Sequence, residues 1–404
     1  MQKIFTPVAN KRLPLLIAIL IVLILNPYFM WWLSSATPLY RIALNFIIPV
    51  LFYLSKEHKD RRTPVVLYLL STFLYVFVGL LLGRASIIGA VSASICFLYI
   101  FVFFANWRLL FDVLEQLINI LFVIVGLSVV AWVIYLTGHL SPMGTIQSPM
   151  IADTTYTMYP LFVVSNNLFE YGSVIRFSGP FVEPGFLGTL VALILVAKKY
   201  NLKDVRLVVL FIAGLFTLSL AFYLISAFFG LFYLAVEKRK IVATVLLVSF
   251  TGIFYWQTKD NSILSQTLYE RVEWNAETKS ISGDNRSNDL VDAYYERIKG
   301  TSDFYFGTSD PNWYQNVAGG NSASYKNVIC INGFLTVALY LLYLLQLGWV
   351  NRRSLAGFIL FAAVFLMNFY QRSSFYSLPV LYLYCCMAKA DNVLQPQMRR
   401  STQI

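Results

Sequence analysis

Long apolar runs separated by short polar stretches are the dominant pattern along this chain. A transmembrane helix needs about 20 mostly apolar residues to cross a hydrocarbon core about 30 Å thick. The pattern therefore predicts about 12 transmembrane helices, with one long run divided at Ser219 because it exceeds the length of a single helix. The expected spans lie at about 13–33, 38–54, 64–82, 86–105, 113–137, 184–197, 205–219, 221–236, 241–256, 328–348, 354–370 and 374–388.

Composition supports an all-α polytopic membrane protein. Hydrophobic residues make up 58% of the 404 residues and charged residues only 13%, whereas about a quarter of the residues in soluble domains are charged. The first apolar run lacks a small-residue cleavage site, so we expect an uncleaved span rather than a signal peptide. The sequence predicts one integral membrane domain over residues 1–404.

The positions of the charges predict the orientation of the spans. If both termini are cytoplasmic, 20 of the 31 Lys and Arg residues fall on the cytoplasmic side, together with seven acidic residues. Lysine and arginine accumulate on the cytoplasmic side of membrane proteins. The formal charge of +11 therefore indicates membrane orientation and gives no support to nucleic-acid binding.

This orientation leaves two large loops on the periplasmic side, at 138–183 and 257–327. The second loop holds ten of the 20 acidic residues of the chain. Loops of this length are usually functional or disordered. Apolar residues at helical spacing predict amphipathic helices at 287–299, stopped by Gly300, and at 262–277.

Metal chemistry and ion-coupled transport find little support in the sequence. The four cysteines lie in apolar runs, the two histidines lie in different loops, and there is no Asp-x-Asp motif. The expected spans hold almost no ionisable residues, although proton or ion relays need them at membrane depth. We therefore expect a metal-independent protein whose polar chemistry lies at the periplasmic face.

Arginine is the informative residue type at that face, because its planar fork binds phosphate oxygens in a bidentate way. Glu183 is the acidic candidate, since it lies where the first large loop re-enters the membrane. It is either a general base or sugar-hydroxyl ligand, or a carboxylate that only orients Arg176. The arginine candidates for binding or catalysis are Arg84, Arg176, Arg271, Arg286 and Arg372.

Three stretches of sequence carry a resemblance to a known family. The first is Arg176-Phe-Ser-Gly-Pro-Phe-Val-Glu183-Pro-Gly185, and the second is Gly283-Asp-Asn-Arg286-Ser before an amphipathic helix. The third runs from Asn321 to Gly333. Together with the topology, they resemble the bacterial O-antigen polymerase and ligase superfamily, and Wzy-type polymerases in particular.

The resemblance implies a GT-C-like fold and glycosyl transfer between lipid carriers without a metal or other cofactor. The product would be O-antigen or capsular polysaccharide, and undecaprenyl pyrophosphate the leaving group. Implied partners are undecaprenyl-pyrophosphate-linked glycans, membrane lipids, a chain-length regulator and a flippase. The implied catalytic residues are Arg176, Glu183 and Arg286, and the implied substrate-binding residues are Arg84, Arg271, Tyr325, Lys326 and Arg372.

The third stretch departs from the ligase branch of this superfamily. Ligases usually carry a histidine, commonly His-Asn, where this chain has Ser324-Tyr-Lys-Asn327. The departure favours a polymerase over a ligase that transfers glycan to lipid A-core or protein. A lipid-linked glycan flippase is the alternative from a different class. Glu183 is the first candidate for the base and Tyr325 the second, while His139 reads as an interfacial residue.

The charge pattern predicts that both large loops face away from the cytoplasm. Single cysteines introduced at Ser148 and at Ser302, in otherwise functional protein, should react with a membrane-impermeant maleimide in intact cells. A cysteine introduced at Ser354, on the cytoplasmic side, is the control and should react only after lysis. Labelling of the loop cysteines only after lysis would contradict the predicted orientation.

Overall fold

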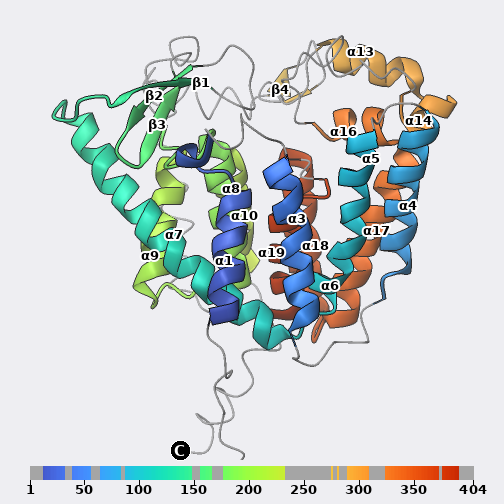
Figure 1. Cartoon of the computed structure of the whole chain (residues 1–404), viewed down its shortest axis with the longest axis horizontal. Helices are drawn as coiled ribbons and strands as arrows, with labels where there is room; N and C mark the ends of the chain where they lie inside the picture. Colours follow the sequence, from blue (N-terminus) through green and yellow to red (C-terminus); the bar gives the residue numbers. More distant parts are fainter. Residues whose placement is uncertain are drawn as a thin grey trace, which may run out of the picture.

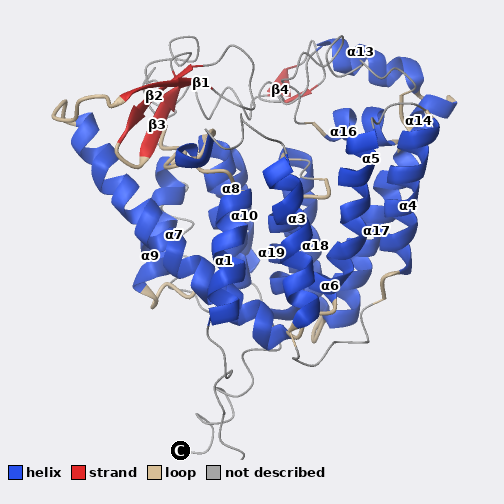
Figure 2. Cartoon of the chain, in the orientation of Figure 1, coloured by secondary structure: helices blue, strands red, loops and turns tan. Residues whose placement is uncertain are grey.

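Helices make up most of the computed structural model of this chain (Figures 1 and 2). The structure describes residues 12–31, 39–55, 64–82, 87–147, 155–165, 176–232, 274–275, 280–281, 289–308, 324–372 and 375–390. The longer helices stand side by side as a bundle, and the strands and the shorter helix α13 (Asp289–Ile298) lie at one end of it (Figure 1). We call this end the loop end.

The helices of the bundle follow the predicted apolar runs, and their bounds are as follows. They are α1 (Arg12–Ile24), α3 (Leu39–Leu54), α4 (Val66–Leu81), α5 (Ile87–Ser94), α6 (Ile100–Phe103), α7 (Trp107–Leu136), α8 (Pro184–Ala197), α9 (Val205–Phe216), α10 (Leu220–Phe232), α17 (Phe334–Asn351), α18 (Leu355–Gln371) and α19 (Leu378–Lys389), with the 3₁₀ turns η1 (Tyr28–Met30) and η2 (Ile95–Tyr99). The predicted span at 241–256 lies outside the described residues.

Two of the described helices, α7 and α17, are long and apolar enough to cross a membrane by length and composition. The other apolar helices have 10–17 residues. Many large hydrophobic side chains on these helices are exposed, which is consistent with a membrane protein. The helical class is therefore confirmed, while the number of crossings, about 12, stays a prediction.

The division of the long run at Ser219 is confirmed. Helix α9 ends at Phe216 and α10 begins at Leu220, with Leu218 between them at a φ of 48°. The turn fits closely over α8, because a Cβ added at Gly188 would lie 2.5 Å from the Cβ of Ser219. Glycine at this position lets the turn rest directly on the first turns of α8.

The predicted span at 328–348 is wrong as a single helix. Helix α16 (Tyr325–Asn332) ends before Gly333, and α17 starts after it. Gly333 has a φ of 82°, and an added Cβ would lie 2.5 Å from the backbone at Tyr305 and Phe306 in α14 (Ser302–Phe306). The apolar run continues through the break, so hydrophobicity alone could not reveal it.

The first large loop contains a three-stranded antiparallel sheet, which the all-α prediction missed. Its strands β1 (Gly144–Gln147), β2 (Thr155–Tyr159) and β3 (Phe162–Ser165) pair in chain order, with Thr157 opposite Val164. The hydroxyl of Ser128 in α7 donates to the carbonyl of Leu161 in the tight β2–β3 turn at 2.6 Å. The sheet is therefore attached to the bundle through α7.

The second large loop contains one of the two predicted amphipathic helices. Helix α13 buries Val291, Tyr294 and Ile298 on one face and ends just before Gly300, whose φ is 80°. The predicted helix at 262–277 is wrong at its end, where β4 (Trp274–Asn275) pairs with β5 (Ser280–Ile281). Most of that predicted helix lies outside the described residues.

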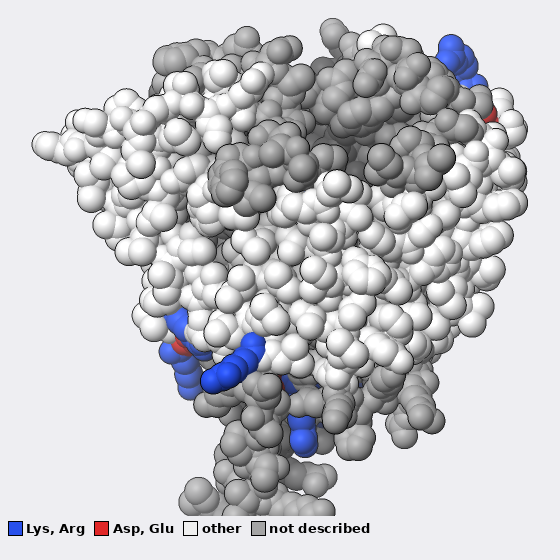
Figure 3. Space-filling model, viewed as in Figure 1, with Lys and Arg blue, Asp and Glu red and all other residues white. Residues whose placement is uncertain are grey.

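Charged side chains occupy the two ends of the bundle in the view of Figure 3. Lysines and arginines gather at the end opposite the sheet and on α13, and the band between them on this face is almost free of charge. At the opposite end, Glu115 in α7 pairs with both Lys198 and Arg206. An uncharged band between charged ends is the distribution that a membrane requires of a helical bundle.

The break at Gly333 generates a stability prediction. Gly333→Ala combines an unfavourable positive φ with backbone overlap, so we expect a loss of at least about 2 kcal/mol in the free energy of unfolding. Gly79→Ala in α4 is the matched control, because an added Cβ there has no neighbour within 4 Å and alanine favours a helix. Thermal unfolding of the purified protein in detergent measures both. Equal unfolding temperatures for the two variants would contradict the prediction.

Candidate functional site

The segment from Arg176 to Gly185 forms the centre of the candidate site. At its start, the Nε and Nη2 atoms of Arg176 donate to the carbonyls of Thr217 and Leu218, at 3.0 and 3.1 Å. The last carbonyls of a helix have no partner within it and carry partial negative charge. The guanidinium thus satisfies the C-terminal end of α9 and fixes the segment on the α9–α10 turn.

Contacts from the sheet and from η1 hold the middle of the segment. The Ser178 hydroxyl donates to the carbonyl of Val163 in β3 at 2.9 Å, and the Tyr28 N–H donates to the carbonyl of Pro180 at 2.7 Å. Gly179 adopts a φ of 55°, which suits glycine. These contacts fix the segment as an edge of the loop end.

Glu183 ends the segment at the start of α8, where it forms an ion pair with Arg372. Its Oε2 atom accepts a hydrogen bond from the Nη2 atom of Arg372, which follows α18. The side chain of Arg372 is 15% exposed and that of Glu183 is 45% exposed. The arginine is thus largely buried behind a carboxylate that a substrate can reach.

Gly185 makes room for this guanidinium. A Cβ added at Gly185 would lie 2.5 Å from the Nη2 atom of Arg372, which is closer than real Cβ contacts allow. The Pro184-Gly185 pair that opens α8 therefore has two roles. Proline supplies the backbone angle favoured at the first helical position, and glycine leaves the space that the arginine occupies.

Tyr156 of β2 lies near the same carboxylate. Its ring packs edge-on against Trp31, with the ring centres 5.2 Å apart, and Val182 packs against the same cluster. Burial, and secondly the negative charge of Glu183, raise the pKa of the Tyr156 hydroxyl above its ordinary value. The sheet of the first large loop therefore supports the site from one side.

Helix α16 carries two further predicted site residues. The ring of Tyr325 stacks on Tyr370 of α18 at 5.9 Å between ring centres. The Nζ atom of Lys326 pairs with Asp292 of α13 at 2.9 Å. Tyr325 thus packs against α18, while Lys326 attaches α13 to α16.

The structure brings together some of the predicted site residues and separates others. Glu183 contacts Arg372, and the Arg176 guanidinium donates to the backbone carbonyls of the α9–α10 turn. The alternative in which Glu183 orients Arg176 stays a prediction. The predicted residues Arg84, Arg271 and Arg286 lie outside the described residues.

Sequence reasoning missed Tyr156 and Asp292. Each acts through a partner that is far away in the chain, so no local motif signals it. Across the described ranges, no three His, Cys, Asp or Glu side chains are grouped so that they could hold a metal ion.

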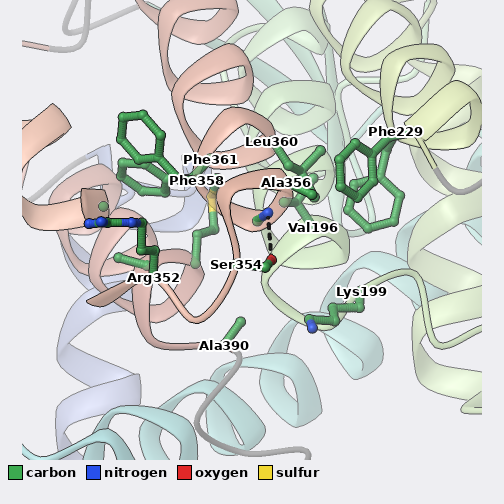
Figure 4. Close-up of a pocket in the computed structure, with 15 residues that line it drawn as sticks. Val196, Lys199, Phe229, Arg352, Ser354, Ala356, Phe358, Leu360, Phe361 and Ala390 are labelled. Atoms are coloured by element: carbon green, nitrogen blue, oxygen red, sulfur yellow. Dashed lines mark hydrogen bonds between the residues drawn. The ribbon is translucent and has the colours of Figure 1, made fainter. Parts of the chain in front are cut away.

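A cavity of about 110 Å³ lies at the opposite end of the bundle (Figure 4). Lys199, Arg352 and Phe361 are among its lining residues, and the Ser354 hydroxyl there accepts from the Gly357 N–H at 3.0 Å to cap α18. The length of α18 separates this cavity from Arg372 by about 25 Å. None of the predicted site residues lines it, so it is distinct from the candidate site.

Comparison of the chain with protein families, with curated proteins and with solved structures finds no match. The functional interpretation therefore depends on the motifs and the geometry of this chain.

The fit of Arg372 over Gly185 generates a prediction. Gly185→Ala should push the guanidinium away from Glu183 without unfolding the protein, because the overlapping atom is the end of a flexible side chain. Arg372 should then react faster with phenylglyoxal than in wild type, where it is 15% exposed. Peptide mass spectrometry measures the modification, and Gly79→Ala is the control. An unchanged rate in Gly185→Ala would show that the guanidinium does not depend on this space.

Proposed function

We propose that this protein is a glycosyltransferase that polymerises undecaprenyl-pyrophosphate-linked repeat units into O-antigen or capsular polysaccharide. The observation that carries the proposal is the half-exposed Glu183 carboxylate held by the largely buried Arg372. Glu183 lies on the segment whose sequence resembles Wzy-type polymerases. The sheet of the first large loop and α13 of the second lie at the same end of the bundle (Figure 1).

The reaction needs a base for the acceptor and a stabiliser for the leaving group. A hydroxyl oxygen of the acceptor sugar attacks the anomeric carbon of the donor glycan, and its proton passes to the Glu183 carboxylate. The bond from the anomeric carbon to the pyrophosphate oxygen breaks, and undecaprenyl pyrophosphate leaves with the electron pair. Arg372 fixes one oxygen of Glu183, which orients the carboxylate toward the acceptor.

Arginine side chains suit the stabilisation of the leaving group. A guanidinium presents planar donors that match phosphate oxygens, so developing charge can be stabilised by preorganised donors. Arg176 lies on the same segment as Glu183, and Arg84, Arg271 and Arg286 are the further arginines proposed for this role. Tyr325 and Lys326, at the start of α16, are proposed to contact the glycan.

The proposed location is the bacterial inner membrane, with both termini cytoplasmic and the loop end periplasmic. Two helices of membrane-spanning length and the band free of charge support a membrane location. The lysines and arginines at the end opposite the sheet support the orientation. The membrane itself then confines both lipid-linked substrates to the plane in which the loop end lies.

Reconstitution with purified lipid-linked repeat units tests the function. Wild-type protein in liposomes should form long glycan chains in the presence of excess chelator. Glu183→Gln removes the proposed base and should slow chain growth by about 100- to 10,000-fold. Arg372→Lys keeps the charge but loses the planar fork, and should cost about 100-fold. Electrophoresis of the labelled glycan measures chain growth.

Lys299→Ala is the matched control, since Lys299 directly follows α13 and pairs with Glu296 at the surface. It should polymerise at the wild-type rate. Full activity of Glu183→Gln, at equal protein abundance, would remove Glu183 from the chemistry. Transfer of a single glycan to lipid A-core, without chain growth, would identify a ligase instead.

A further inference from the structure

An apolar groove runs between α7 and α9 on the side of the bundle. Its volume is about 460 Å³, within the range of small-molecule sites. Exposed side chains such as Val123, Leu127 and Ile212 lie along it. All of its lining residues are apolar or glycine: Phe122, Val123, Gly126, Leu127, Val129, Val130, Val209 and Ile212.

Gly126 creates the depth of this groove. A Cβ added there would lie 3.5 Å from a methyl group of Val209, so the two helices approach closely at this point. The neighbouring valines are short and branched, and they leave a channel along the contact instead of filling it. The groove therefore fits a thin apolar chain better than a second helix.

The groove leads toward Arg176. Val129 and Trp132 share one face of α7, and Ile212 and Phe216 share one face of α9, because residues three or four apart lie above one another. The ring of Trp132 contacts Phe216 and also Phe177, at 5.2 and 5.6 Å between ring centres. The groove thus ends about one helical turn below these aromatic rings.

A cationic group lies directly beyond the rings. Arg176 precedes Phe177, and its guanidinium is fixed on the carbonyls of Thr217 and Leu218, just after the end of α9. An apolar channel with a guanidinium at its loop end is complementary to one kind of molecule. That molecule has a long apolar chain with a phosphate group at its end.

We propose that this groove holds the polyisoprenyl chain of a lipid-linked substrate, with its phosphate end toward Arg176. The inference rests on the proposed function, because that function supplies a polyisoprenyl pyrophosphate as donor and leaving group. It assigns the groove to one polyisoprenyl chain. Occupation of the groove by a two-chain phospholipid, or by other residues of the polypeptide, is the other outcome of the test.

Photochemical labelling of the full-length protein in lipid nanodiscs tests the site. The probe is a polyisoprenyl phosphate that carries a diazirine in the middle of its chain, and phosphatidylglycerol with a diazirine in one acyl chain is the comparison. The polyisoprenyl probe should label peptides that contain 122–130 and 209–212. Unlabelled polyisoprenyl phosphate should compete with it, and unlabelled phosphatidylglycerol should not.

Two variants with a matched control locate the chain. Gly126→Leu fills the groove and should lower labelling by about tenfold. Gly126→Ala adds a Cβ at an ordinary contact distance, folds normally and should lower labelling to a smaller extent. Gly79→Leu adds the same side chain on α4, where an added Cβ has no neighbour within 4 Å, and should label as wild type does.

Three results would overturn the inference. The first is equal labelling of the groove by phosphatidylglycerol, and the second is unchanged labelling in Gly126→Leu. The third is a cross-link between a cysteine introduced by Leu127→Cys and residues 241–256. The proposed function fails separately. Wild-type protein that labels in the groove but forms no polymer would contradict the polymerase, and not the lipid site. Protein that forms polymer but is labelled outside the groove would contradict only the lipid site.

Discussion

The ion pair between Glu183 and Arg372 is the interaction on which the loop end of this protein depends. A guanidinium that is largely removed from water is costly unless a partner and hydrogen bonds compensate for it. The pair forms because Pro184 turns the chain into α8, and because Gly185 leaves the space in which the arginine rests. The sheet supports the carboxylate from one side, through the cluster that contains Tyr156 and Val182. Removing the arginine would leave the carboxylate without the contact that sets its direction.

The anchoring of Arg176 has a different physical basis. Its guanidinium binds helix-end carbonyls instead of a carboxylate, so it joins the site to the α9–α10 turn. The two arginines thus have distinct local contacts. Arg372 pairs with the Glu183 carboxylate, and Arg176 places a positive charge near the end of α9. In the proposed reaction, these contacts give the two arginines different tasks.

The apolar runs were sufficient to predict the helices, because burial or lipid exposure demands continuous hydrophobicity whatever the tertiary contacts. They could not predict the break at Gly333, which arises where α14 crosses the chain so closely that a Cβ has no room. The sheet was also missed, since its strands are short and their buried residues do not alternate with exposed ones. Within the site, the motif from Arg176 to Gly185 was visible in the sequence. The sequence did not show that Arg372 is the ion-pair partner of Glu183, because contact between distant residues leaves no local pattern.

The separation between the two halves of the ion pair has a consequence for biogenesis. Glu183 and Arg372 are 189 residues apart, and α8 and α18 enter the fold at different stages of synthesis. A nascent chain that has completed α10 already possesses the carboxylate, the sheet and the Arg176 anchor, and it still lacks the guanidinium that directs the carboxylate. The site therefore matures only when nearly the whole chain has been inserted. Under the proposed function, a partly synthesised chain would therefore lack the directed carboxylate that the transfer of lipid-linked sugars requires.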